Sequence, residues 1–252
     1  MDVGKLVAQL YTVKDFTQTP GEIEKTLKKV KEIGYGAVQV SGIGPIDPYH
    51  LKNLADEAGV QIVVTHVPYG RMINDFDALV KEHKIWNCEY VGLGSMPPEY
   101  SRDYDGYARF ARDFSGIARK FADHGLKFVY HNHDFEFEKY NGKTGLEIIF
   151  DESDPEVFGF EIDTYWVQAG GADPVAWTRK VKGRMEVIHL KDMAIKERKQ
   201  VFAEIGEGNL NWSEILKACN DIGVRWYCVE QDVCPGDPFE SLAISFRNLK
   251  AM

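Results

Sequence analysis

The sequence has few of the features that mark secreted, membrane-spanning or disulfide-linked proteins. Its four cysteines, at positions 88, 219, 228 and 234, form no CxxC pair, so neither a redox motif nor a zinc–thiolate cluster is predicted. No apolar run approaches the roughly 18 residues that span a bilayer. The first residues carry neither the basic nor the apolar segment of a secretory signal. Together these absences favour a reduced, cytoplasmic protein with no membrane partner.

Clustered positive charge is also lacking. The chain has 30 Lys and Arg residues against 39 Asp and Glu residues, which gives a net charge of −9. Binding to a phosphate backbone depends on clustered Lys and Arg, so a nucleic-acid partner is not expected. Neither a glycine-rich phosphate loop nor an arginine cluster is present, and this favours an unphosphorylated small-molecule substrate.

Short apolar runs rich in β-branched and aromatic residues alternate with longer amphipathic stretches throughout the 252 residues. The short runs predict strands at Leu6–Leu10, Ala37–Val40, Gln61–Thr65, Tyr90–Leu93, Lys127–Tyr130, Phe158–Ile162, Met185–Leu190 and Trp226–Val229. The amphipathic stretches predict helices at Pro20–Ile33, Tyr49–Ala58, Asp75–Trp86, Tyr104–His124, Gly145–Phe150, Pro174–Val181, Trp212–Asp221 and Pro238–Lys250.

The alternation repeats at roughly 30-residue intervals, and strand–helix alternation of this kind builds parallel sheets with covered faces. Eight units without a spare element predict a closed (β/α)8 TIM barrel of the α/β class, in one domain that spans residues 1–252. An open doubly wound sheet is the alternative. It is disfavoured because no GxGxxG motif follows the first strand.

Polar residues at the ends of four consecutive predicted strands indicate a metal site. His131, Asp163, His189 and Glu230 end strands five to eight. Neighbouring strands lie about 5 Å apart, so these side chains can converge on one ion. A single His or Asp at a strand end is more often structural, but four in succession favour a divalent cation. The mixed nitrogen and oxygen donors suit Mn2+, Zn2+, Co2+ or Fe2+ better than Ca2+.

At these residues the sequence resembles the sugar phosphate isomerase/epimerase superfamily, whose members have a xylose isomerase-like barrel. The resemblance covers essentially the whole chain. It is carried by Gln9-Leu10-Tyr11, Thr65-His66-Val67-Pro68, Tyr130-His131-Asn132-His133-Asp134, Asp163-Thr164, His189-Leu190-Lys191-Asp192, Gly206-Glu207-Gly208 with Trp212, and Glu230-Gln231-Asp232.

The resemblance implies one divalent metal, with Mn2+ expected first and Zn2+, Co2+ or Mg2+ as alternatives. By position it assigns Asp163, His189 and Glu230 as ligands. Epimerases of the superfamily carry Glu where this chain has His131, so the fourth ligand stays open among His131, His133 and Glu136. The same departure brings the chain closer to the branch that resembles inosose dehydratase.

This constellation suits proton abstraction from a carbon next to a carbonyl. The base candidates are Glu230, His131 and His133, and Lys191 is expected to bind a substrate oxygen or stabilise an enolate. An isomerase or epimerase acting on a sugar or keto-sugar is the default interpretation. A lyase or dehydratase acting on a keto-inositol or 3-keto-glycoside is the alternative. A non-catalytic sugar-binding or partner subunit is the alternative from another class.

Further substrate contacts are predicted for His66, Glu207, Tyr11 and Trp166, with Trp166 and Tyr11 forming an apolar wall against one face of a sugar. Trp212 is predicted to extend that wall. Asp192 is expected to orient either Lys191 or a metal-binding histidine. Because members of the superfamily are often dimers or tetramers, the resemblance also allows a homo-oligomer.

Overall fold

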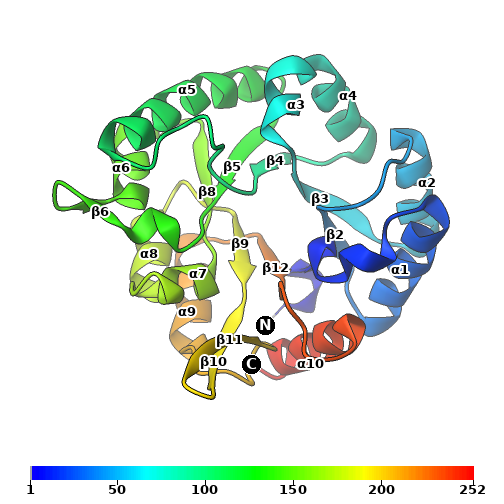
Figure 1. The fold of residues 1–252 in the computed structure, drawn as a ribbon. Helices are drawn as coiled ribbons and strands as arrows, with labels where there is room; N and C mark the ends of the chain where they lie inside the picture. The colour runs from blue at the N-terminus through cyan, green and yellow to red at the C-terminus, as the bar shows by residue number, and fades with distance from the viewer. Residues whose placement is uncertain (1) are drawn as a thin grey trace.

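The computed structural model describes residues 2–252. Eight strands form the inner wall, with helices outside them (Figure 1). The strands are β1 (Leu6–Gln9), β2 (Ala37–Val40), β3 (Gln61–His66), β4 (Tyr90–Leu93), β5 (Lys127–His131), β8 (Phe158–Glu161), β9 (Val187–Leu190) and β12 (Trp226–Val229). All eight predicted strands are therefore present, with ends that differ from the prediction by at most two residues.

Ten α-helices lie between and after the strands. They are α1 (Pro20–Ile33), α2 (Pro48–Ala58), α3 (Tyr69–Asn74), α4 (Phe76–Trp86), α5 (Tyr104–Asp123), α6 (Gly145–Glu152), α7 (Thr164–Ala169), α8 (Pro174–Lys180), α9 (Trp212–Ile222) and α10 (Pro238–Ala251). Within residues 2–252, no helix has a stretch apolar and long enough to cross a membrane.

The eight strands are parallel and follow the order β8-β5-β4-β3-β2-β1-β12-β9. Strands β8 and β9 meet at a single parallel bridge between Asp163 and His189. There the backbone N–H of His189 donates to the carbonyl oxygen of Ile162 over 2.9 Å. The barrel is thus nearly closed, and the prediction of a single-domain (β/α)8 fold is confirmed.

The helix boundaries follow from local sequence. Asp173 and Asp237 cap α8 and α10, and each precedes a proline at the first helical position. Gly59 and Gly223 end α2 and α9 with φ values of 70° and 84°. This left-handed conformation favours glycine because it lacks a Cβ.

Side chains alternate along each strand, so every second residue points into the barrel. The inward side chains form two layers. The apolar layer is separate from the core between strands and helices, and it consists of Val7, Ala37, Val63, Val64, Tyr90, Val129, Val187 and Cys228. The polar layer consists of Gln9, Gln39, His131, Glu161, His189 and Glu230, all buried at the carboxyl ends of the strands.

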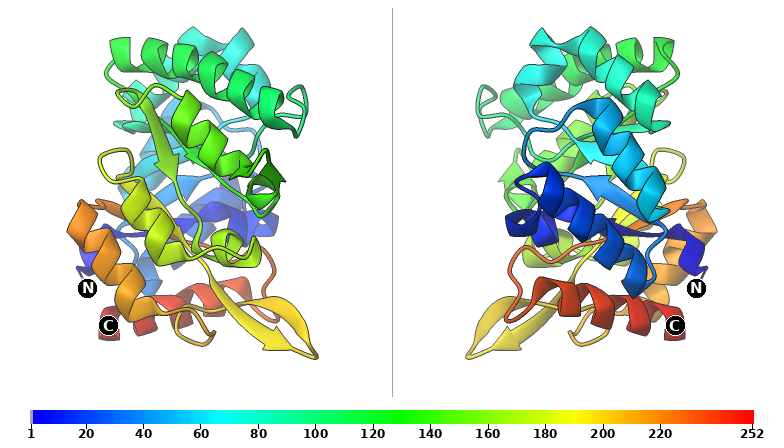
Figure 2. Two further views of the ribbon diagram at one scale, coloured as in Figure 1. Left: turned by 90° about the vertical axis from the view of Figure 1, so that its left-hand side faces the viewer. Right: turned by 90° about the vertical axis from the view of Figure 1, so that its right-hand side faces the viewer.

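Several short elements were not predicted from the sequence. They are α3, α7, the 3₁₀ helices η1 (Val3–Lys5), η2 (Leu10–Phe16) and η3 (Phe135–Phe137), the hairpin of β6 (Lys139–Tyr140) and β7 (Lys143–Thr144), and the hairpin of β10 (Asp192–Lys196) and β11 (Lys199–Ala203). Figure 2 shows the β10–β11 hairpin projecting from the barrel. Its turn residues Glu197 and Arg198 have φ values of 52° and 65°, the twist that suits a two-residue hairpin turn.

Candidate metal centre

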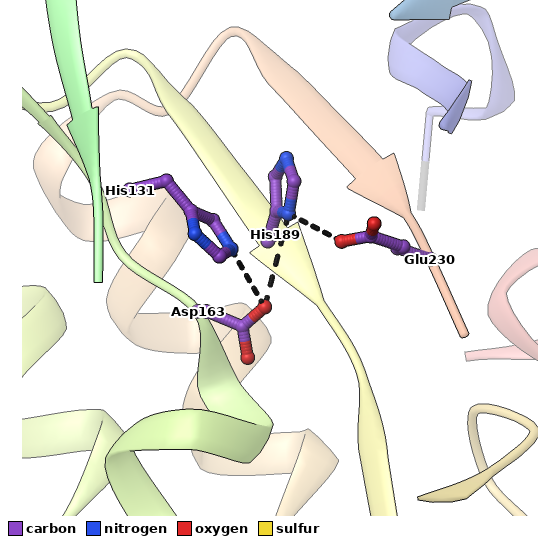
Figure 3. Close-up of side chains that lie close together, drawn as sticks. All are labelled: His131, Asp163, His189 and Glu230. Carbon is purple, nitrogen blue, oxygen red and sulfur yellow. Dashed lines mark hydrogen bonds and ion pairs between the residues drawn. The ribbon is translucent and has the colours of Figure 1, made fainter. Parts of the chain in front are cut away.

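The structure brings four predicted metal ligands together at the carboxyl end of the barrel. His131, Asp163, His189 and Glu230 each offer one ligand atom, and these atoms all lie within 4.8 Å of one another. All four side chains are buried. Figure 3 shows His131, His189 and Glu230 pointing toward Asp163 or toward each other from separate strand ends.

Asp163 is held in place by the start of helix α7. Its Oδ1 accepts a hydrogen bond from the backbone N–H of Trp166 over 2.9 Å. Its own backbone N–H donates to Oδ1 of Asn132 over 3.1 Å. The second oxygen, Oδ2, therefore faces the cluster, 3.1 Å from Nε2 of His131 and 3.7 Å from Nδ1 of His189.

In His131, the hydrogen bond made by Nδ1 determines whether Nε2 carries a proton. Nδ1 lies 3.1 Å from the carbonyl oxygen of Gly94, which can only accept a hydrogen bond, so Nδ1 carries the proton. In the neutral ring, Nε2 is then a lone pair directed at the carboxylate of Asp163. Two acceptors in contact repel unless a proton or a metal cation lies between them.

His189 shows the same arrangement. Its Nε2 lies 2.7 Å from Oε1 of Gln39 and 3.1 Å from a carboxylate oxygen of Glu161, so Nε2 is the donor. Its Nδ1 then faces Oε2 of Glu230 at 2.8 Å. Within residues 2–252, both of these atoms are buried without a hydrogen-bond partner. The donor set of two imidazoles and two carboxylates fits a divalent transition metal, and His131, Asp163 and His189 are each held in place by a hydrogen bond to their other polar atom.

Lys191 adds a positive charge at the edge of the cluster. Its Nζ lies 2.8 Å from Oε2 of Glu230, 3.2 Å from Oδ2 of Asp163 and 2.7 Å from Oδ2 of Asp232. Burial would lower the pKa of Lys191, but these three carboxylates raise it above its ordinary value. Lys191 is therefore an ammonium donor and cannot act as a base near neutral pH.

The two clustered carboxylates remain ionised despite burial. Burial alone would raise the pKa of both Asp163 and Glu230, but Lys191 and the neighbouring histidines hold each pKa below its ordinary value. For His189, burial would lower the pKa, whereas Glu161, Glu230 and Asp163 raise it well above the ordinary value, so without a metal cation Nδ1 carries a proton in the place that the cation would take. The centre therefore attracts positive charge strongly.

A cavity of about 680 Å³ opens above the cluster. Two of the four clustered residues, His131 and Glu230, line it together with Lys191 and Asp232. Much of the remaining wall consists of Tyr11, Ser41, His66, Pro68, Tyr69, Ser95, Met96, Glu99 and His133. This volume is in the range of small-molecule sites.

Of the three candidates for the strand-five ligand, only His131 reaches the cluster. The ring of His133 lines the cavity, 5.7 Å from the ring of Phe135 and 5.3 Å from that of Trp166. Burial lowers the pKa of His133 to about 3. Glu136 accepts hydrogen bonds from the hydroxyl of Tyr130 and the backbone N–H of His133, and burial raises its pKa to about 7.

Of the four predicted substrate contacts, two line the cavity and two do not. His66 and Tyr11 line the cavity, and Trp166 lies behind it with its ring 5.8 Å from Nζ of Lys191. Glu207 does not line the cavity. It is exposed, and its carboxylate accepts a hydrogen bond from Nδ2 of Asn248 over 2.9 Å.

The prediction that Asp192 orients Lys191 or a metal-binding histidine is wrong. Its carboxylate accepts hydrogen bonds from the backbone N–H groups of Gly206 and Gly208 and from Nε1 of Trp212. Asp192 thus fixes the loop that follows β11. Trp212 donates to Asp192 and does not line the cavity, so it does not extend the apolar wall of the cavity.

Sequence reasoning missed Glu161, which is fully buried inside the barrel. Its carboxylate lies between Nε2 of His66, at 2.6 Å, and Nε2 of His189, at 3.1 Å, and it accepts from Nε2 of Gln39. A signal for it was available. Glu161 stands two residues before Asp163, and strand alternation points both side chains into the barrel.

A parallel eight-stranded barrel with its polar cluster at the carboxyl ends of the strands defines the TIM-barrel class. The sequence model of the xylose isomerase-like TIM barrel family matches residues 27–250. The chain belongs to this family, which confirms the resemblance drawn from its motifs.

Individual relatives are distant in sequence. The chain is 24% identical over 207 residues to inosose dehydratase 2 of Bacillus cereus, a match that covers 73% of this chain and 67% of that protein. A crystal structure of a sugar phosphate isomerase/epimerase from Parabacteroides distasonis ATCC 8503 matches with a TM-score of 0.82, at 23% identity over 98% of this chain and 94% of that one. The structure of an L-ribulose 3-epimerase matches with a TM-score of 0.73, at 14% identity over 98% and 93%.

Proposed function

We propose that the chain is a divalent-metal-dependent isomerase or epimerase that removes a proton next to the carbonyl of a keto-sugar. The observation that carries this proposal is the orientation of two imidazole nitrogens and two carboxylates at the base of a cavity. Family membership supports it, and so do the similar proteins named as isomerase/epimerase and 3-epimerase.

His131, Asp163, His189 and Glu230 would hold the cation. A bound divalent cation polarises a carbonyl, which lowers the barrier to proton removal by several kcal/mol. The native metal is proposed to be Mn2+, with Zn2+, Co2+ or Mg2+ as alternatives.

The other roles follow from position. Glu230 directs Oε2 toward His189 and Lys191, and its other oxygen makes no hydrogen bond within residues 2–252. We assign Glu230 as a proton acceptor, which requires the ionised form that Lys191 favours. Lys191 donates from the cavity wall to a substrate oxygen as negative charge develops there. His133, neutral at the wall, binds a hydroxyl group.

A lyase that eliminates water or an alcohol is the second candidate. His131 stands where epimerases of the superfamily carry a carboxylate, and the sequence relative is named an inosose dehydratase. The same enolate would lose a substituent from the next carbon instead of regaining a proton.

Deuterium incorporation distinguishes these reactions. The purified chain, after metal analysis and loading with Mn2+, is incubated in D2O with a ketose, an inosose and a methyl 3-keto-glucoside. Deuterium at one carbon of an unchanged or isomerised sugar supports an isomerase or epimerase. An unsaturated product supports the lyase. Metal and sugar binding with no exchange supports a non-catalytic sugar-binding subunit and refutes the proposal.

Glu230→Gln is the critical variant, and it should abolish exchange. Glu240→Gln is the matched control, because it removes the same charge from a position that is 59% exposed on α10. Its exchange rate should equal that of the wild type. Full exchange in Glu230→Gln would exclude the assigned acceptor.

A further inference from the structure

The His66 side chain connects the cavity with the interior of the barrel. It is the last residue of strand β3 and lines the cavity, with 13% of its side chain exposed. Its Nε2 lies 2.6 Å from Oε2 of Glu161, which reaches across the barrel from β8. The His66 ring centroid lies 5.2 Å from those of both His131 and His189, so His66 is adjacent to the metal centre.

Glu161 determines which nitrogen of His66 carries the proton. A carboxylate can only accept hydrogen bonds, so the short contact places the proton on Nε2. Nδ1 is then the acceptor. Within residues 2–252 it has no hydrogen-bond partner, and it is not among the atoms buried without one. The pair therefore presents a lone pair to the cavity, with a negative charge behind the ring.

Two glycines next to β3 provide the space for this ring. A Cβ at Gly94 would lie 3.1 Å from Nδ1 of His66, and a Cβ at Gly92 would lie 2.9 Å from its Cδ2. Side chains at these positions would press on the ring, and one at Gly94 would partly cover Nδ1. The missing side chains keep Nδ1 accessible from the cavity.

An epimerase that works from both faces of a substrate needs two proton-transfer groups. Glu230 is one of them. His131 cannot be the other, because Nδ1 donates to Gly94 and Nε2 faces Asp163. Lys191 is held as a cation by three carboxylates. His66 ends β3, and Glu230 directly follows β12. Strands β2 and β1 lie between β3 and β12, so the two side chains approach the cavity from different parts of the barrel wall.

We propose that His66 is the second proton-transfer group of this site and that Glu161 is the positioning residue that fixes its tautomer. The inference rests on the proposed function. Ionised Glu230 takes the proton from one face as the substrate C–H bond breaks, and the electron pair stays on the substrate as an enediolate. Nδ1 of His66, protonated from water while Nε2–H keeps its bond to Glu161, returns a proton to the other face. Glu230 then releases its proton to water, which restores the ionised carboxylate and the neutral imidazole.

The tautomer can be measured directly by 15N NMR of the full-length chain loaded with diamagnetic Zn2+, with the His66 signals assigned from their loss in His66→Gln. We expect Nε2–H in the wild type. In Glu161→Gln an amide N–H can face Nε2, so we expect the proton of His66 to move to Nδ1. Glu136→Gln is the matched control, because Glu136 is another fully buried carboxylate with two donors, and it should retain Nε2–H. An unchanged tautomer in Glu161→Gln would overturn the positioning role.

The proton-transfer role is tested by deuterium incorporation into whichever panel sugar the wild type exchanges. His66→Gln should lower the exchange rate by about 10²- to 10⁴-fold. A second group, His66, Glu161 and His189, could also hold a metal ion. If the cation binds at the four-residue cluster instead, the Kd of His66→Gln for Mn2+ should stay within about twofold of the wild type. The proposal would be overturned if His66→Gln retained exchange, or if its loss of exchange followed from weaker Mn2+ binding. It would also be overturned if a comparable loss occurred in His133→Gln and not in His66→Gln. A wild type inert toward every sugar would refute the proposed function, and the tautomer measurement would still decide the role of Glu161.

Discussion

The apolar and polar layers of the barrel interior lie two residues apart on the same strands, yet their contents differ completely. On β9, Val187 belongs to the apolar layer and His189 to the polar layer. On β12, Cys228 and Glu230 stand in the same relation. Both layers are buried by the same backbone geometry, so the difference between them comes from side-chain chemistry alone.

The comparison separates two uses of burial. In the apolar layer, removal of hydrocarbon from water stabilises the fold. In the polar layer, burial removes carboxylates and imidazoles from water, which is unfavourable unless each is paired. Most atoms there do have partners, but Nε2 of Gln9, Nδ1 of His189 and Oε2 of Glu230 lack hydrogen bonds within residues 2–252, and Oε2 is left with its ion pair to Lys191. The apolar layer therefore supports the fold, and the polar layer contains a cluster that could bind a metal.

The largest expected effect is loss of metal binding in His189→Ala. This variant removes one of four ligands, so Mn2+ affinity should fall by more than about 100-fold. In the wild type, free Mn2+ at 100 times its Kd should add about 2.7 kcal/mol to the free energy of unfolding. Isothermal titration calorimetry and urea unfolding with and without Mn2+ measure both effects. Equal Mn2+ protection of the variant and the wild type would remove the distinction between the layers.

A second prediction concerns Glu136, a buried carboxylate close to the polar layer but outside the metal cluster. Burial raises its folded-state pKa to about 7, above the ordinary value of 4.5. Its contribution to stability is therefore complete below the unfolded pKa and is lost as pH rises through the folded one. The loss amounts to about 3 kcal/mol between about pH 4 and about pH 8.

Glu136→Gln isolates this effect, because Gln does not ionise. The free energy of unfolding of the wild type, minus that of the variant, should fall as pH rises through this window. Urea denaturation of the wild type and the variant at several pH values measures this difference. Other titrating groups contribute equally to both proteins, so their effects cancel. A difference independent of pH would show that Glu136 is ionised throughout.

A smaller effect, on stability alone, is expected for Val187→Ala in the apolar layer. Val187 is fully buried, and removal of two methyl groups should destabilise the fold by about 2 kcal/mol. Because the variant leaves His189 intact two residues away, its Kd for Mn2+ should match that of the wild type. A clear loss of metal affinity would mean that packing in the apolar layer positions the ligand.

Sequence patterns predict the repeating parts of the fold well. Strands such as Ala37–Val40 and Tyr90–Leu93 match the structure at both ends because their apolar runs have sharp boundaries. The β10–β11 hairpin was missed because its turn is Glu197-Arg198, whereas the familiar hairpin signal is Asn or Asp before Gly. Helix α7 was missed because six residues are too short to show a helical period.

The candidate site was predicted to the extent that its residues stand at strand ends. His131, Asp163, His189 and Glu230 were chosen in this way, and the structure gathers them. Glu161 lies inside the predicted strand Phe158–Ile162, although it ends β8 in the structure, and a single charged residue inside a strand gives little signal unless alternation is counted back from Asp163. The role of Asp192 was misassigned because neighbouring strand residues point in opposite directions, so Asp192 faces away from Lys191 and toward the loop.

The smallest effect is expected for Glu207→Gln, which tests whether the Gly-Glu-Gly loop belongs with the polar layer. The sequence resemblance predicts a substrate contact here, but the carboxylate lies on the surface against Asn248 and outside the cavity lining. An exposed substitution of this kind changes stability by less than about 0.5 kcal/mol. The deuterium-exchange rate and the KM for the exchanging sugar should both stay within about twofold of the wild type. A rise in KM with unchanged Mn2+ affinity would instead mean that the loop moves toward the cavity when substrate binds, and it would add Glu207 to the functional end of the barrel.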